Sequence, residues 1–231
     1  MSDIKKEKNI LYIGSGNSAT LAKNLDLDKY TVCCVNNAWK LFEGQYFDYW
    51  IHSGDFPNEN RPKKGQIKFK DEISYTQYKV SSEEFTKKIK AKCTSPQHYL
   101  GYTIFFLGLY WIINTLDPEK ISLLGFDHDY NSDKVKKWNE NNRPNPQNQY
   151  GKEKDQTIAD WSNSFFAGMD KDFFYGHGTP DPIRLGEKQL IDKFQRAVDI
   201  CEDLNIKLVN LSPVESKINN IEKEQVGHAT K

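Results

Sequence analysis

The sequence carries no excess charge of either sign. Among its 231 residues, 32 are lysine or arginine and 32 are aspartate or glutamate, so the formal net charge at pH 7 is zero. Such a chain has no overall field that attracts a polyanion, and no basic block stands out among its mixed charges. A nucleic-acid partner is therefore unsupported, although a modified nucleobase as substrate stays open.

The sequence also lacks a long hydrophobic segment. Residues 1–8 are charged and are followed by only a short apolar run, unlike a secretory signal. The longest apolar segment, residues 102–113, falls short of the roughly 20 residues that a transmembrane helix needs. We expect a cytoplasmic protein with no membrane span.

The four cysteines lack the paired spacing of a metal site. Cys33 and Cys34 are adjacent in an apolar segment, so on a strand they would point to opposite faces. Together with Cys93 and Cys201, they are expected to be reduced core residues.

What the sequence does have is an alternation of short apolar runs with helical patterns, in a chain long enough for one α/β domain. Strands are predicted at residues 9–14, 31–36, 46–53, 121–125 and 206–211. Helices are predicted at 19–25, 39–42, 98–116 and from Gly186, where Leu190, Ile191, Phe194, Ala197, Val198 and Cys201 recur at helical spacing. The alternation predicts an α/β fold of Rossmann-like type, with an open, mostly parallel sheet and helices on both faces.

One polar segment interrupts this alternation in the first half of the chain. We interpret residues 56–92 as a decoration, with a strand pair at 67–80 and a charged helix from Ser82 that is capped by Ser81 or Ser82.

A second irregular segment lies in the other half. Residues 131–149 are rich in Asn, Lys and Pro, and long loops in compact domains usually serve function, so a lid or insertion is expected at about 131–176. The single domain is expected to span 1–221 and to end in a flexible tail at 222–231.

Gly14 and Gly16 stand in a turn between the first predicted strand and a helix. Glycine there lets backbone amides approach a phosphate or ribose, and a helix N-terminus favours negative charge. The turn, which includes Ser15 and Asn17, is therefore a candidate nucleotide site. Because Ala19 replaces the third glycine of the dinucleotide fingerprint, a plain strand-to-helix connection explains the turn equally well.

Polar residues follow the next two predicted strands. Asn36 and Asn37 come after one, and His52 and Ser53 after the other. Ligands of open parallel sheets bind outside the carboxyl ends of the strands, so these side chains would outline a crevice. Asparagine is also a common loop residue, which is the alternative without the neighbouring glycine turn.

Asp127 and Asp129 flank His128 directly after the strand at 121–125. Two carboxylates one residue apart could hold Mg²⁺ or Mn²⁺ on a diphosphate. The preferred alternative is a strand-end turn in which Asp127 caps a loop, because the pattern is short.

His177 lies between two glycines, after the aromatic residues 173–175 and before the long final helix. Glycine neighbours would let it face a cleft, and its unperturbed pKa lets an imidazole accept a proton near neutral pH. It is therefore a candidate general base, with a structural histidine as the alternative.

Several of these pieces occur in the order of a known family. They are Ile13 to Ser18, Cys34 to Asn36, Leu123 to Asp127, Tyr175 to His177, and Ile206 to Pro213. In this order the chain resembles glycosyltransferase family 42, the bacterial sialyltransferases that use a CMP-activated sugar, and more loosely the Rossmann-like group related to motility accessory factors. The block at 206–213 is the most specific part of the resemblance.

The resemblance implies an inverting transfer that needs no metal or other cofactor, with His177 as general base. It also implies that the glycine turn and Asn36 bind the nucleotide. We further assign Gly125 to the nucleotide and His52 and Ser53 to the acceptor side, although the family tends to have asparagine where His52 stands. The candidate residues on the donor phosphate or sugar are Asp127, Asp129, Tyr130, Tyr150 and Thr103.

The chain departs from the family at Asp129. The family stabilises the leaving phosphate with tyrosine hydroxyls, whereas Asp129 stands at the first matching position, and its negative charge would repel a phosphate unless a cation intervened.

Three functions stay open. The preferred one is transfer of a sugar from a nucleotide-activated donor, CMP-linked by the resemblance, to a hydroxyl of a glycan or another acceptor. The second is a metal-dependent pyrophosphokinase or other nucleotide-handling enzyme that uses Asp127 and Asp129, and the third is a non-catalytic nucleotide-binding module. The donor, the acceptor and assembly into a homo-oligomer are left open by the sequence.

Overall fold

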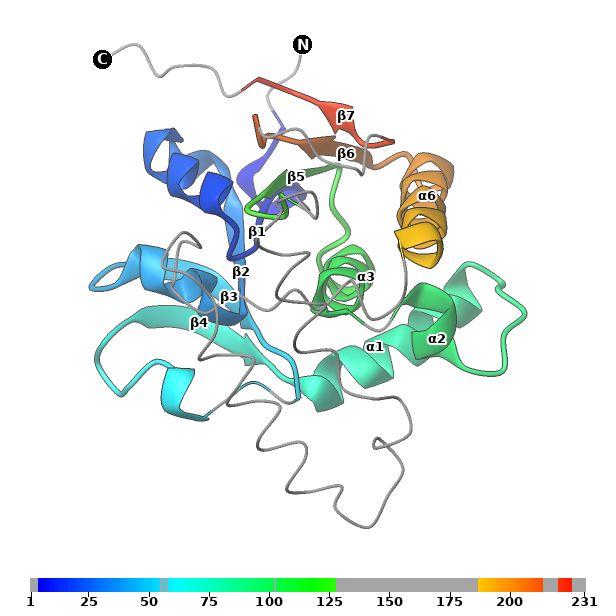
Figure 1. Ribbon diagram of the computed structural model, residues 1–231, viewed down its shortest axis with the longest axis horizontal. Helices are drawn as coiled ribbons and strands as arrows, with labels where there is room; N and C mark the ends of the chain where they lie inside the picture. The colour runs from blue at the N-terminus through cyan, green and yellow to red at the C-terminus, as the bar shows by residue number, and fades with distance from the viewer. Residues whose placement is uncertain are drawn as a thin grey trace.

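The computed structural model describes residues 4–54, 56, 58–101, 103–127, 187–213 and 220–225 of the chain. In these residues seven strands form one parallel sheet in the order β4-β3-β2-β1-β5-β6-β7 (Figure 1). The strands are β1 (Asn9–Ile13), β2 (Thr31–Val35), β3 (Tyr46–Ile51), β4 (Lys68–Ile73), β5 (Lys120–Leu124), β6 (Lys207–Asn210) and β7 (Glu222–Lys223). Strand order runs outward in both directions from β1 and β5, so the topological switch point lies between these two strands. The predicted Rossmann-like α/β fold is confirmed.

Helices cover both faces of the sheet (Figure 1). One face carries α1 (Tyr75–Lys88), α2 (Pro96–Leu100), α3 (Ile104–Leu116) and α6 (Glu187–Asp203). The other carries two 3-10 helices, η2 (Asn17–Asn24) and η4 (Asn36–Phe42). Three single-turn 3-10 helices lie in connections: η1 (Lys6–Lys8), η3 (Leu27–Lys29) and η5 (Asn58–Asn60).

Each central strand buries side chains on both of its faces. In β1, Tyr12 belongs to the cluster formed with the α-helices, whereas Leu11 belongs to the cluster formed with η2 and η4. Cys33 and Cys34 of β2 divide in the same way, as predicted from their adjacency. Burial on both faces explains why these strands have continuous apolar sequences and no polar alternation.

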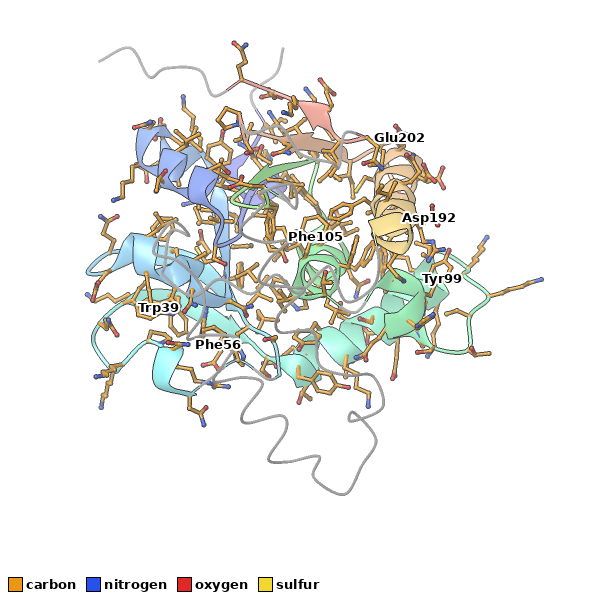
Figure 2. The ribbon with its side chains drawn as sticks, in the orientation of Figure 1. Trp39, Phe56, Tyr99, Phe105, Asp192 and Glu202 are labelled. Atoms are coloured by element: carbon orange, nitrogen blue, oxygen red, sulfur yellow. The ribbon has the colours of Figure 1, made fainter. Side chains whose placement is uncertain are left out.

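The core between the sheet and the α-helices is rich in aromatic rings. Phe105 of α3 lies between the sheet and α6 (Figure 2), with its ring centroid 4.8 Å from that of Phe194 and 6.0 Å from that of Tyr12. A Cβ added at Gly108 would lie 2.2 Å from Oη of Tyr12, so glycine is needed for this close approach. Oη of Tyr12 lies 3.1 Å from the carbonyl oxygens of both Ile104 and Phe105. The contact fixes the first turn of α3 against the sheet.

The single helix predicted at 98–116 is wrong, because Gly101 interrupts it. Gly101 has a φ of +113°, and a Cβ there would lie 2.5 Å from the ring of Phe106. The chain turns at this glycine, and α3 begins anew with Thr103 as its N-cap. A hydrophobic pattern does not reveal such a break, because the apolar run continues through it.

The decoration predicted at 56–92 is also wrong, since β4 is an edge strand of the main sheet and α1 packs on α3. Instead of a strand pair there is one strand followed by a helix that begins after Ser74, whose amide donates to Oε1 of Gln77 at 3.0 Å. Ser81 and Ser82, predicted as caps, are buried inside α1. With Tyr78 and Phe85 they form the helical spacing that marks the buried face of α1.

In the second half of the chain, the structure bears on the final helix and on the C-terminal residues. The final helix is confirmed as α6, with Phe194, Ala197 and Cys201 buried, although Ile191 is 39% exposed. The tail predicted at 222–231 begins with β7, which pairs with β6. Within the part of the chain that the structure describes, no helix combines the length and apolar character of a membrane span.

Candidate functional site

The carboxyl ends of β1 and β5 meet at the switch point through two glycine turns. The amide of Gly14 donates to the carbonyl of Leu124 at 2.8 Å, and that of Gly16 donates to the carbonyl of Gly125 at 2.8 Å. A Cβ at Gly14 would lie 2.5 Å from the oxygen of Gly125, and a Cβ at Gly125 would lie 2.4 Å from the oxygen of Gly14. The two turns therefore require glycine for their mutual approach. The amides of Gly14 and Gly16 are thus paired with protein carbonyls.

Asp127 occupies the start of η2, the position that the sequence analysis offered to a ligand anion. Its Oδ2 accepts a hydrogen bond from the amide of Ser18 at 2.9 Å. Its Oδ1 accepts hydrogen bonds from the hydroxyls of Ser18 and, at 2.7 Å, Ser212. A carboxylate there is stabilised by the exposed amides and the dipole of a helix N-terminus. Asp127 therefore binds the first turn of η2, a contact with a distant segment that the sequence did not predict.

Ser212 is a site residue that the sequence analysis did not single out. It follows β6, and its amide donates to Oδ1 of Asn210 at 2.9 Å while its hydroxyl reaches Asp127. It belongs to the block at 206–213 that carries the most specific part of the family resemblance. The ends of β1, β5 and β6 are in this way joined through one carboxylate.

Asn36 links the ends of β2 and β3. Its φ of +47° is left-handed, a conformation that asparagine tolerates better than most residues. Its Oδ1 accepts the amide hydrogen of Ser53 at 3.0 Å, and its carbonyl accepts Nε1–H of Trp50 at 3.0 Å. Asn36 and Ser53, predicted in one crevice, are brought together by this contact, and Asn36 is the first residue of η4.

His52 does not stand open at this edge. It is 2% exposed, and its ring centroid lies 4.6 Å from that of Trp50. Its Nδ1 lies 3.0 Å from the carbonyl of Ser53, and its Nε2 lies 2.9 Å from Oε1 of Glu72 on β4. His52 was predicted in the crevice with Ser53. Its side chain is instead buried in the core, where it packs on Trp50 of β3.

A cleft lies at the carboxyl ends of β3 and β4. Its volume is about 240 Å³, and we call it the β3–β4 cleft. Its lining includes Ser53, Tyr75, Tyr78, Gln97, Ile104 and Leu107. These residues come from the end of β3 and from α1, α2 and α3. The cleft therefore depends on the segments 56–92 and 98–116, whose structure was predicted wrongly from the sequence.

Several predicted site residues cannot be compared with the structure. His177, Asp129, Tyr130, Tyr150 and the predicted lid at 131–176 lie outside the described residues, as does the side chain of Asn17. Thr103 is described, and it is 8% exposed at the N-cap of α3. Ser15 is half-buried in the glycine turn.

No protein-family model, curated protein or solved structure matches the chain. The resemblance to family 42 therefore stays a prediction. In the residues that the structure describes there is no group of three or more His, Cys, Asp or Glu side chains that could hold a metal ion.

Proposed function

We propose that the protein binds a nucleotide-activated sugar at the carboxyl edge of its sheet and transfers the sugar to a hydroxyl acceptor. One observation carries the proposal: motifs distant in the sequence converge at the switch point. The glycine turn after β1, the turn after β5 and the end of β6 are joined through Asp127. Open α/β sheets bind their ligands at this place.

A metal-independent reaction is the form of transfer that the hydrogen bonds favour. Asp127 accepts three hydrogen bonds from Ser18 and Ser212, which occupy both of its carboxylate oxygens. A magnesium ion would have to compete with these donors. The proposal gives the role of general base to His177, on the sequence argument that its glycine neighbours let it face a cleft.

The test is hydrolysis of CMP-, UDP-, GDP- and dTDP-sugars by the purified protein, with and without EDTA. We expect one donor to be hydrolysed in EDTA and the rate to fall at least about 100-fold in His177→Ala, as for loss of a general base. His228→Ala is the matched control, because its sequence setting has neither the glycines nor the aromatic residues.

Other outcomes overturn the proposal in distinct ways. Loss of hydrolysis in EDTA would favour the metal-dependent nucleotide enzyme. Binding of a nucleotide in a calorimeter, without turnover of any donor, would favour the non-catalytic module.

A further inference from the structure

Gln97, a residue that lines the β3–β4 cleft, carries a buried hydrogen-bond donor that has no acceptor. Nε2 of Gln97 is buried and has no hydrogen-bond partner among the described residues. An amide donor buried without a partner is unfavourable, because it has lost water and gained nothing in return. Rotation of the Gln97 side chain toward the cleft would let the acceptor oxygen of a ligand satisfy it.

Aromatic side chains form part of the same cleft. Tyr75, the first residue of α1, is 45% exposed, and its ring meets that of buried Tyr78 edge to face at a centroid distance of 5.5 Å. Exposed tyrosine rings offer an apolar face to a ligand while their hydroxyl stays hydrated. Ser53, which follows the carboxyl end of β3, adds a hydroxyl-bearing side chain to the lining.

The charge and the size of the cleft restrict its ligand. Among the described residues that line it, none is Asp, Glu, Lys, Arg or His. A charged ligand would therefore lose its hydration without meeting an opposite charge. The volume of about 240 Å³ lies below the roughly 300–1,000 Å³ of pockets that hold drug-sized molecules, so the cleft suits a single ring.

Helix α2, which carries Gln97, is held firmly against α6. Nζ of Lys193 donates to the carbonyl of His98 at 2.6 Å, and the guanidinium of Arg196 donates to the carbonyl of Tyr99. The Arg196 guanidinium also lies 4.3 Å from the centroid of the Tyr99 ring (Figure 2 shows Tyr99 beside α6). Cations at the C-terminal carbonyls stabilise this short helix and fix the place of Gln97.

We infer that the β3–β4 cleft binds one neutral ring, packed on Tyr75, whose acceptor oxygen receives a hydrogen bond from Nε2 of Gln97. Uncharged sugars and the oxygen-bearing bases of nucleosides share this chemistry. The site itself does not depend on the proposed function. The further assignment of this cleft, beside Ser53, as the binding site of the hydroxyl acceptor rests on the proposed function.

The test is binding without any donor, followed by saturation-transfer NMR and calorimetry. The probes are methyl glycosides of neutral hexoses, the four nucleosides, and the matching hexuronic acids and nucleoside monophosphates. We expect a member of one neutral set to bind and its charged counterpart to bind at least about tenfold more weakly. Binding by a hexoside or by a nucleoside supports the site and identifies which source supplies the ring.

Variants separate recognition from folding. Gln97→Met keeps the length of the side chain without its amide, so it is expected to weaken binding about tenfold and to leave the melting temperature unchanged or higher. Tyr75→Ala is expected to weaken binding, whereas Tyr46→Ala and Gln45→Met, which alter exposed residues at the opposite end of β3, are expected to bind as the wild type does.

Three results would overturn the site: no neutral probe binds, charged probes bind equally well, or Gln97→Met lowers the melting temperature and so reveals a structural partner for the amide. Failure of the proposed function is separate from these. If the protein binds a neutral ring but hydrolyses no sugar nucleotide, the proposed site is supported and the proposed transferase function is not. If it hydrolyses a sugar nucleotide but binds no neutral ring, only the transferase function is supported.

Discussion

At the scale of single residues, the polar groups at the edge of the sheet are held by contacts between distant parts of the chain. Asp127 bonds to Ser18, 109 residues earlier, and to Ser212, 85 residues later. Asp127 and the glycine turn are each recognisable in the sequence, but as separate features. Only the adjacency of β1, β5 and β6 makes them one cluster, because no local pattern encodes which strand ends are neighbours.

The contact between the two glycine turns can be tested by one methyl group. Gly125→Ala is expected to destabilise the protein because the new Cβ would lie 2.4 Å from the carbonyl oxygen of Gly14. Gly65→Ala is the matched control, since Gly65 has a similar positive φ, +83° against +72°, but open space around its Cβ. The free energy of unfolding, measured in urea, should be lower in Gly125→Ala by about 1–3 kcal/mol relative to Gly65→Ala. Equal losses would show that the two turns do not pack as described.

At the scale of elements, the edges of the sheet were the hardest parts to predict. β4 has one buried residue among its six, so its sequence lacks the apolar run that identifies a central strand. β7 is only two residues long and both are exposed. Central strands were predicted well because both of their faces are buried, which leaves a strong apolar signal.

An ionic cluster anchors β7 to its neighbours. Glu224, just after β7, accepts hydrogen bonds from Lys120 at the start of β5 (2.7 Å) and from Lys207 at the start of β6 (3.1 Å). Burial by itself would raise the pKa of Glu224, but the two lysines outweigh it and hold the pKa below its ordinary value of 4.5. The ionised carboxylate therefore stabilises the fold at pH values above the ordinary pKa. This contribution is lost as the pH falls through the lowered pKa.

Removal of this charge should flatten the dependence of stability on pH. Glu224→Gln is expected to lose less than about 1 kcal/mol at neutral pH, because the cluster is partly exposed, and to lose less stability than the wild type on acidification. Urea unfolding at a series of pH values from neutral to below 4.5 measures both effects. Glu222→Gln is the control: the carboxylate of Glu222, in β7 itself, lies 3.8 Å from Nζ of Lys207 and is 66% exposed, so this variant should behave as the wild type. A wild-type pH profile in Glu224→Gln would contradict the assignment.

At the scale of the whole molecule, the cysteines report on the integrity of the core. Cys33, Cys34 and Cys201 are buried, and Cys93 is half-buried. Burial raises the pKa of Cys33 and Cys34 far above the ordinary thiol value and raises that of Cys201 to about 12. Because the thiolate is the reactive form, these three thiols should stay inert while the protein is folded.

Thiol titration with a chromogenic disulfide tests this expectation. One thiol, Cys93, is expected to react in the native protein, and the other three only at the rate of unfolding or in denaturant. Cys93→Ser should abolish the native reaction and leave three thiols in the unfolded chain. Rapid reaction of a second thiol in the native protein would contradict the burial of Cys33, Cys34 and Cys201.

The class of fold follows from local sequence patterns. Alternating apolar runs and helical patterns specify a parallel sheet covered on both faces, because periodicity reflects which faces of each element are buried. These patterns also located the strand ends where Asn36, Ser53 and Asp127 lie. Tertiary structure alone decided that β4 joins the sheet, that Gly101 divides α2 from α3, that His52 is buried, and that Asp127 fills the helix start offered to a ligand. The cleft around Gln97 belongs to the same class, since it forms where four elements meet. Such features depend on contacts between residues far apart in the chain, and local patterns hold no record of those contacts.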